Sequence, residues 1–337
     1  MKIVYYSNIS EECLGVLYEQ NLYPINQIKG LHVKSLEEFL RLEKKGWDIL
    51  NEFHKSIIDT PDNFIKVDAN KCIIQAPLKK PNSFRDAYAF RQHVTTSRMN
   101  RGLEMISEFD HFPIFYFSNH NAIQGPYEVI ECMPDHFEKL DYELEIAIII
   151  GKKGRNIKAQ EADKYIAGFT ILNDFSARRL QMEEMKLNLG PAKGKDFSSV
   201  IGPYLVTPDE LENNLIDAPE GHFGKCYDLE MKCWVNGELL SSGNMSSMHW
   251  TFAEIIERCS YGATLYPGDI IGSGTVGTGC LLEINGTNKI NNASYEEKWL
   301  ENGDVVEMEI SKLGRIKNKI AIENSELSIL KLKKNKS

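Results

Sequence analysis

The pattern of apolar and polar positions changes near residue 70. Before that point, residues 35–53 (SLEEFLRLEKKGWDILNEF) place apolar side chains at helical spacing, and Ser35 with Glu38 three positions later is a helix-start signal. Gly46 interrupts the pattern, so we expect two short helices that break there. No residue in this part has an obvious chemical role. We therefore predict a small N-terminal α+β domain over residues 1–70.

After residue 70 the pattern changes to short apolar runs bounded by turn residues, which predicts strands. The expected strands are residues 72–74, 113–117, 143–150, 166–173, 204–206, 228–235, 269–272 and 305–310. Helical spacing is confined to residues 159–165, 177–189 and 251–260, and residues 280–284 (CLLEI) look like a further strand. We expect a β-rich α+β catalytic domain over residues 71–325, followed by a solvated basic tail over 326–337.

Composition narrows the class of partner and the compartment. The chain has 337 residues with 48 acidic and 39 basic side chains, a net charge of −9, which argues against nucleic acid as a partner. No apolar run approaches the roughly 18 residues of a membrane helix, and the N-terminus lacks the pattern of a signal peptide. The seven cysteines form no CxxC pair, so we expect reduced thiols, no membrane association and a cytoplasmic protein.

The strongest chemical signal is a set of acidic residues at strand ends. Glu143 and Glu145 are two positions apart, so both carboxylates project from one face of an otherwise apolar strand. Asp174 ends a second apolar strand, and Asp86 begins a polar segment. Each acid alone also fits a solvated strand face or a helix cap. If they converge, their oxygen atoms favour Mg²⁺, Mn²⁺ or Ca²⁺.

Three further features are weaker. His93 follows Asp86 in an unusually polar segment, although a single histidine is more often packed or on the surface. Residues 190–197 (GPAKGKDF) and 272–279 (GSGTVGTG) are rich in glycine, but both lack the spacing of a phosphate-binding loop. With a strand expected after the second loop, nucleotide binding is not supported.

Taken together, the chain resembles the fumarylacetoacetate hydrolase family, and its fumarylacetoacetase-like branch in particular. The resemblance covers about residues 81–320. Its carriers are DAYAFRQH (86–93), DYELEIAIIIG (141–151), GFTILNDFSARRLQ (168–181), GPAKGKDFSSVIGPYLVT (190–207), WVNGELLSSGN (234–244), TLYPGDIIGSGT (264–275) and NGDVVEMEISKLG (302–314). It implies a mixed β-sandwich roll that holds a divalent cation and acts on 2-oxo or 1,3-dioxo acids.

The resemblance also implies roles for individual residues. The metal carboxylates would be Asp86, Glu143, Glu145 and Asp174, with Lys195 and Ser199 beside the cation. Substrate contacts would come from Tyr88, Arg101, Arg178, Gln181 and Thr275, and Met185 stands where the branch has a substrate-binding tyrosine. Arg98 is a rival to Arg101. His93 would be the general base, and Glu283 the carboxylate that orients it.

These assignments lead to a hypothesis of metal-dependent hydrolysis of a carbon–carbon bond in a 1,3-diketo acid, such as fumarylacetoacetate or an acylpyruvate. His93 would take a proton from water, while Lys195 and Gln181 donate to the oxyanion. Two alternatives remain open: decarboxylation or isomerisation of 2-oxo acids on the same scaffold, and a non-catalytic binding protein. Mg²⁺ is the cation expected first, with Ca²⁺ or Mn²⁺ as alternatives. The resemblance also implies a homodimer and a place in aromatic catabolism.

Overall fold

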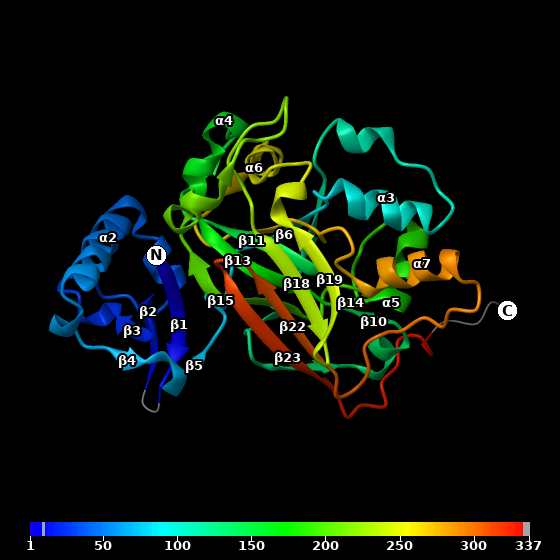
Figure 1. The fold of residues 1–337 in the computed structure, drawn as a ribbon, viewed down its shortest axis with the longest axis horizontal. Coiled ribbons are helices and arrows are strands. Elements are labelled where there is room, and N and C mark those ends of the chain that lie inside the picture. Colours follow the sequence, from blue (N-terminus) through cyan, green and yellow to red (C-terminus); the bar gives the residue numbers. More distant parts are fainter. Residues whose placement is uncertain (9–10, 333–337) are drawn as a thin grey trace.

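The computed structural model describes residues 1–8 and 11–332, so the last five residues of the predicted basic tail lie outside the described part. Two large mixed sheets dominate the structure, and helices are few and short (Figure 1). This arrangement confirms the predicted β-rich α+β fold class.

The larger sheet has 12 strands. Its main path runs in the order β4 (Val67–Asp68), β3 (Asn21–Pro24), β2 (Glu12–Tyr18), β1 (Lys2–Ser7), β15 (Ser199–Val206), β13 (Ile166–Asp174), β11 (Leu144–Ile150), β21 (Ile270–Gly272), β6 (Phe84–Ala87) and β7 (Phe115–Ser118). Off this path, β5 (Ile73–Ile74) pairs with β1, and β8 (Ile123–Gln124) pairs with β15. Most pairs are antiparallel, but β21 with β6 and β15 with β8 are parallel.

The second sheet has five strands and packs on the centre of the first (Figure 1). Its order is β19 (Glu238–Asn244), β18 (Glu230–Val235), β22 (Val305–Ile310), β23 (Gly314–Ile322) and β9 (Val129–Cys132). Ile146 and Ile148 of β11 share one apolar cluster with Met231 and Met308 of this sheet. Ile149, on the other face of β11, belongs to a second cluster, so β11 is buried on both faces, as its apolar run predicts.

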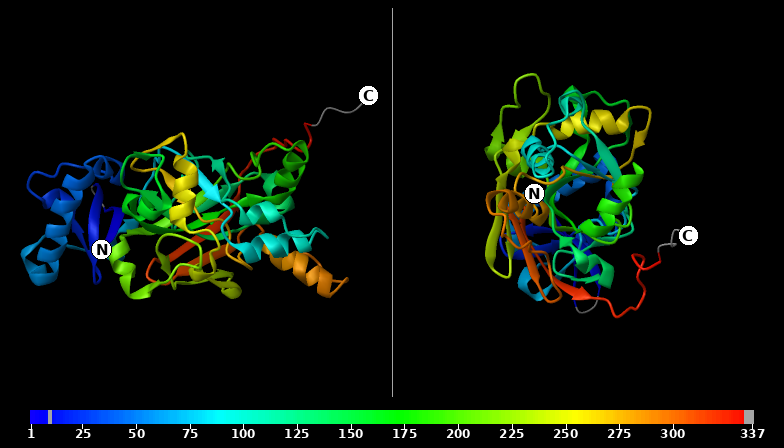
Figure 2. Two further views of the ribbon diagram at one scale, coloured as in Figure 1. Left: turned by 90° about the horizontal axis from the view of Figure 1, so that it is seen from above. Right: turned by 90° about the vertical axis from the view of Figure 1, so that its right-hand side faces the viewer.

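In the part of the chain that the structure describes, three short strand pairs and seven α-helices complete the fold. The pairs are β10 (Leu140–Asp141) with β14 (Ser176–Ala177), β12 (Gly154–Arg155) with β20 (Thr264–Leu265), and β16 (Leu215–Ile216) with β17 (Cys226–Tyr227). The helices are α1 (Leu36–Leu40), α2 (Glu43–Asp59), α3 (Arg91–Met99), α4 (Ala159–Ala162), α5 (Arg178–Glu184), α6 (Phe252–Ser260) and α7 (Leu281–Asn291). Helices α3 and α7 pack side by side (Figure 2).

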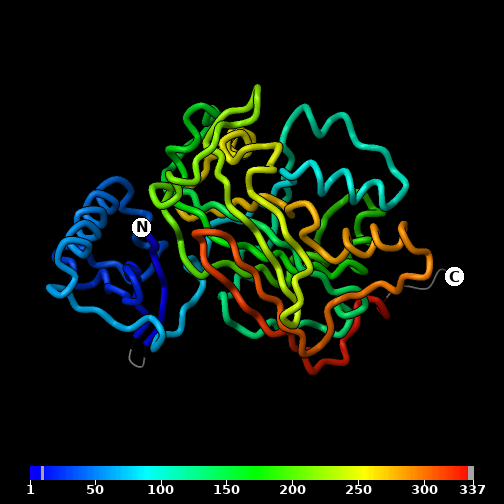
Figure 3. Tube along the Cα trace, viewed as in Figure 1, coloured from blue at the N-terminus to red at the C-terminus, as the bar shows by residue number. Residues whose placement is uncertain are grey.

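The N-terminal segment extends the large sheet, because β1 hydrogen-bonds to β15. It lies at one end of the molecule, and α3, α5 and α7 lie at the other (Figure 3). Ser35 caps α1 by accepting from the Glu38 N–H, as predicted, but the expected break at Gly46 is wrong, since α1 ends at Leu40 and Gly46 lies within α2. A Cβ on Gly46 would come within 2.9 Å of the Leu42 Cβ, so glycine permits close packing there. The division at residue 70 stays a prediction.

Residues 280–284 correct a second expectation. They are not a strand but the N-cap and first turn of α7, which begins at Leu281. The backbone N–H groups of Leu281 and Leu282 donate to Asp141, at 2.7 and 3.0 Å, so the helix receives its capping carboxylate from 140 residues earlier. Local sequence could not reveal that cap.

Two observations bear on environment. Among the described residues, none of the helices is both long enough and apolar enough to span a bilayer. All seven cysteines are free thiols, as the spacing predicts.

Candidate active site

Four buried carboxylates converge at the ends of neighbouring strands in the large sheet. Asp86 lies in β6, Glu143 directly precedes β11, Glu145 lies within β11, and Asp174 ends β13. None is more than 5% exposed. Ligand oxygen atoms of Asp86, Glu143 and Asp174 all lie within 4.8 Å of one another. The strand periodicity that placed Glu143 and Glu145 on one face therefore brings both to this cluster.

The glycine-rich segment after β21 closes around these acids. The Gly274 N–H donates to Asp86 Oδ1 at 3.2 Å and to Glu145 Oε2 at 3.1 Å. Gly274 has a φ of +79°, and a Cβ on Gly272 would stand 2.4 Å from Asp86 Oδ1. Residues 272–275 (GSGT) are rich in glycine because the backbone must come close to the carboxylates. Their glycines therefore serve the acidic cluster rather than a phosphate group.

Two basic side chains and a hydroxyl group contact the same acids. The Lys195 ammonium pairs with Glu143 and lies 2.7 Å from Asp174 Oδ2, and Ser199 Oγ donates to Asp174 Oδ1 at 3.0 Å. The Arg178 guanidinium contacts Glu143 Oε1 at 2.7 Å. Burial alone would raise the pKa of Glu143, but the neighbouring Lys195 and Arg178 hold it below its ordinary value.

Two of the other acids, Asp86 and Glu145, have raised pKa values. Burial, reinforced by the charge of Asp174, raises the pKa of Asp86 to about 7. Burial and the charges of Asp86 and Glu143 raise the pKa of Glu145 well above its ordinary value. Charge-rich, oxygen-only donor sets of this kind suit hard divalent cations, so the residues fit the predicted metal site.

A histidine–carboxylate pair lies beside the cluster. His93 on α3 places Nδ1 2.8 Å from Oε2 of Glu283 on α7. Both side chains are buried, at 5% and 1% exposure. A charge on His93 would lower the pKa of Glu143, so the pair lies within electrostatic reach of the acids. The ring of Tyr88 stands edge-on to His93 at 5.7 Å, and burial raises the pKa of Tyr88 to about 12.

The predicted substrate residues fall into two groups. Thr275 and Gln181 lie against the acids or their partners: Thr275 Oγ1 is 3.4 Å from Glu145, and Gln181 Oε1 accepts from Arg178 at 3.0 Å. Arg178 is 2% exposed and forms ion pairs with Asp141 and Glu143, which is a positioning geometry.

The remaining predicted contacts lie farther out. Arg101 donates from Nε to the Ser97 carbonyl at 3.0 Å, and its charge lowers the pKa of Tyr88 against the larger effect of burial. The rival Arg98 instead donates to the Glu104 carbonyl. Met185 is 51% exposed, beyond the C-terminus of α5.

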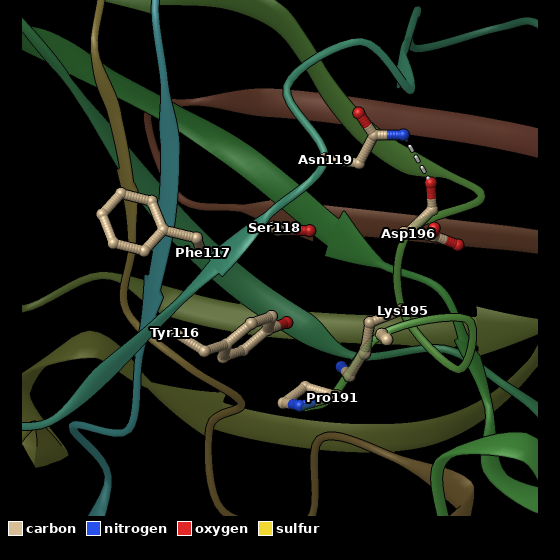
Figure 4. Close-up of a pocket in the computed structure, with 8 residues that line it drawn as sticks. Tyr116, Phe117, Ser118, Asn119, Pro191, Lys195 and Asp196 are labelled. Carbon is tan, nitrogen blue, oxygen red and sulfur yellow. Dashed lines mark hydrogen bonds between the residues drawn. The ribbon is translucent and has the colours of Figure 1, made fainter. Parts of the chain in front are cut away.

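Sequence reasoning missed two residues. The Tyr116 hydroxyl donates to Asp174 Oδ2 at 2.5 Å, and its ring lines a cavity of about 280 Å³ together with Lys195 and Pro191 (Figure 4). Asp141 accepts from Arg178 Nε at 2.8 Å and caps α7. Asp141 was visible only as the start of an acidic motif, and Tyr116 gave no signal, because it occupies an ordinary aromatic position in a strand.

Comparison with known proteins agrees with this geometry. Residues 82–321 match the family model described as fumarylacetoacetate (FAA) hydrolase C-terminal. The chain is 36% identical over 211 residues to the mitochondrial oxaloacetate tautomerase Fahd2a of Rattus norvegicus, a match covering 62% of this chain and 58% of that relative. It is 30% identical over 306 residues to the oxaloacetate tautomerase YisK of Bacillus subtilis, covering 90% of each chain.

Solved structures show the same fold. A maleylpyruvate hydrolase from Sphingobium sp. SYK-6, in complex with manganese(II) and pyruvate, aligns with a TM-score of 0.67 at 18% identity, over 96% of this chain and all of the other. A fumarylacetoacetate hydrolase from Exiguobacterium antarcticum and a probable 2-hydroxyhepta-2,4-diene-1,7-dioate isomerase from Mycobacterium abscessus also share the fold. From the match over most of its length, the chain belongs to the fumarylacetoacetate hydrolase family.

Proposed function

We propose that this protein is a divalent-metal-dependent tautomerase of 2-oxo acids, with oxaloacetate as the first substrate to test. The proposal departs from the hydrolysis favoured by sequence reasoning and adopts the isomerisation alternative. Its support is the name shared by the mammalian and Bacillus relatives, the latter matching along nearly the whole chain. The match to Fahd2a spans only 58% of that relative's length, so its activity is carried over as a proposal.

The name shared by the relatives carries the proposal, and the structural feature suited to moving the proton is the buried His93–Glu283 pair next to the carboxylate cluster. Keto–enol interconversion moves one proton between the C3 carbon and the oxygen on C2. A base with an adjacent carboxylate suits this task, because the carboxylate stabilises the imidazolium that forms.

Asp86, Glu143, Glu145 and Asp174 would hold the divalent cation, with Mg²⁺ expected first and Mn²⁺ or Ca²⁺ as alternatives. When bound, the cation supplies Lewis acidity to the carbonyl oxygen of the substrate.

The protein's own groups carry the proton and the charge. His93 takes a proton from C3 of the keto form, or returns one to it, while Glu283 Oε2 holds the ring through Nδ1. The Glu143 and Asp174 carboxylates raise the pKa of the buried Lys195 against the effect of burial, so its ammonium stays charged. Lys195 is thereby suited to donate to the developing enolate oxygen.

A second candidate is hydrolytic cleavage of a 1,3-diketo acid. The same pair favours it, because His93 could instead take a proton from water that attacks a carbonyl carbon. Hydrolysis and tautomerisation therefore differ in which proton His93 moves, and in whether the carbon skeleton breaks.

A spectrophotometric assay separates these activities. The metal-loaded protein is mixed with enol oxaloacetate, and the loss of enol absorbance is compared with that in chelator and with the His93→Ala variant. The exposed His111, changed to Ala, provides the matched control. The proposal is supported if the metal-loaded wild type and His111→Ala proteins speed ketonisation, while His93→Ala and the chelated protein do not. Cleavage of fumarylacetoacetate or acetylpyruvate without any effect on oxaloacetate would establish the hydrolytic candidate. Homodimer formation, a cytoplasmic location and aromatic catabolism stay predictions.

A further inference from the structure

Cys280 lies beside the His93–Glu283 pair and has no role in the proposed reaction. A ligand nitrogen of His93, the Cys280 sulfur and a carboxylate oxygen of Glu283 all lie within 4.8 Å of one another. We call these three residues the mixed-donor cluster. Exposure is 5% for His93, 0% for Cys280 and 1% for Glu283, so all three side chains are buried.

One buried oxygen of this cluster makes no hydrogen bond to the described residues. Glu283 Oε2 faces His93, but Oε1 of Glu283 has no hydrogen-bond partner within residues 1–8 and 11–332. A buried carboxylate oxygen without a donor is costly, because it has lost water and gained nothing in return. Glu283 therefore keeps a buried oxygen with unused capacity, in a carboxylate that lies within 4.8 Å of the Cys280 sulfur and a His93 nitrogen.

The fold holds these donors on two packed helices. Cys280 is the N-cap of α7, and Glu283 lies three residues later in its first turn, while His93 lies on the facing helix α3. Asp141 fixes the start of α7 through the N–H groups of Leu281 and Leu282. The donors therefore come from ordered positions rather than from a loose loop.

The donor types differ from those of the oxygen-only site. Nitrogen, sulfur and oxygen from His, Cys and Glu are the ligands of zinc, whereas Mg²⁺ and Ca²⁺ prefer oxygen alone. Bonds of about 2.0 Å to nitrogen and oxygen and 2.3 Å to sulfur put tetrahedral ligands about 3.3–3.5 Å apart. Because the donor atoms lie within 4.8 Å of one another, the side chains must close by up to about 1.5 Å.

Charge also favours a divalent cation here. Cys280 is fully buried, and a buried thiol keeps its proton when no cation is near. Zn²⁺ would replace that proton, which leaves for solvent, and a Zn–S bond forms with no change of oxidation state. The thiolate and the Glu283 carboxylate then balance the two positive charges, and neutral His93 binds through the ring nitrogen that carries no proton.

We propose that His93, Cys280 and Glu283 form a second metal site, selective for zinc and similar thiophilic cations and separate from the four carboxylates. A cation there occupies the His93 lone pair and the Glu283 carboxylate. It therefore inhibits any reaction in which His93 is the base, a consequence that rests on the proposed function.

The test measures bound zinc directly. Wild type, Cys280→Ser and Cys259→Ser proteins are dialysed against Zn²⁺ in excess Mg²⁺, and zinc per chain is determined by elemental analysis. Cys259 is the matched control, since it is also buried but lies on α6. We expect wild type and Cys259→Ser to bind one zinc more than Cys280→Ser, whose affinity at this site falls at least ~10-fold. Equal zinc in all three proteins would overturn the proposal.

Cobalt gives an independent readout that does not depend on catalysis. Co²⁺ added to the wild type should produce a thiolate-to-metal charge-transfer band, which Cys280→Ser lacks and Cys259→Ser keeps. The same band in all three proteins would exclude Cys280 as a ligand. If zinc and cobalt bind as expected but do not slow tautomerisation of oxaloacetate, the metal site at the mixed-donor cluster is confirmed and His93 is not the base of the reaction.

Discussion

Asp141 ties together the two halves of the candidate site. Its carboxylate is fully buried and accepts from the Leu281 and Leu282 N–H groups at the start of α7, the helix that carries Glu283. It also accepts from Arg178, which in turn contacts the predicted metal ligand Glu143. Asp141→Asn keeps the size of this side chain but removes its charge and places an amide against N–H donors.

The structure sets the expected size of the loss. Neutralising one partner of a buried ion pair costs about 3–5 kcal/mol, and we expect the lower end because Arg178 keeps its contact with Glu143. An unfolding entropy of about 2.1 cal/mol/K per residue gives roughly 0.7 kcal/mol/K for 337 residues, so Tm should fall by about 4 °C.

Thermal unfolding followed by circular dichroism, in excess chelator, measures this loss without a contribution from bound cation. Asp62→Asn is the control, since Asp62 pairs with Lys66 on the surface and should matter little. Arg178→Met should also lower the free energy of unfolding. The double variant should lose less stability than the sum of the two single losses, because it removes both charges of the Asp141–Arg178 pair and leaves neither buried without its partner. If Asp141→Asn has the same Tm as the wild type, or the stability losses of the two single variants simply add in the double variant, the proposed coupling between Asp141 and Arg178 is wrong.

Three further predictions concern single residues. His93→Ala should lower kcat by at least ~100-fold and leave cation affinity near that of the wild type, measured by steady-state kinetics and metal titration; retention of most turnover would remove His93 from the role of base. Gly274→Ala should weaken cation binding, because a side chain at φ +79° meets the Ala87 carbonyl at 2.5 Å and displaces the N–H that Asp86 accepts, and unchanged affinity by calorimetry would contradict this. Burial lowers the pKa of His136 to about 4, so between about pH 6.5 and pH 4 the unfolded chain binds a proton that the folded chain does not. The free energy of unfolding should therefore fall by up to ~3 kcal/mol as the pH drops through this range. Denaturant unfolding of His136→Phe should show a smaller fall, and a pH dependence identical to that of the wild type would assign the effect to another group.

The sequence predicts the core strands and the acidic residues because both are local patterns. The alternation of Glu143 and Glu145 within an apolar run fixes which face they share. The structure brings Glu143 together with Asp86 and Asp174, and Glu145 accepts from the same Gly274 N–H as Asp86. The single apolar stretch of β11 likewise predicts a strand buried on both faces.

Features that depend on distant partners escape such reasoning. The start of α7 is set by Asp141, 140 residues earlier, so CLLEI alone looks like a strand. Tyr116 on β7 donates to Asp174 at the end of β13, although three strands lie between β7 and β13 in the sheet order. Gly46 looks like a helix breaker, yet in the structure it makes room for Phe39 and Leu42.

Proton exchange at C3 of oxaloacetate tests the central claim most directly. Proton NMR in heavy water follows the C3 signal of oxaloacetate with the metal-loaded protein, with chelator, and with His93→Ala. The account predicts rapid replacement of the C3 protons by deuterium, without loss of substrate, only for the metal-loaded protein with His93 intact. Exchange no faster than in buffer, or conversion to pyruvate in place of exchange, would contradict it.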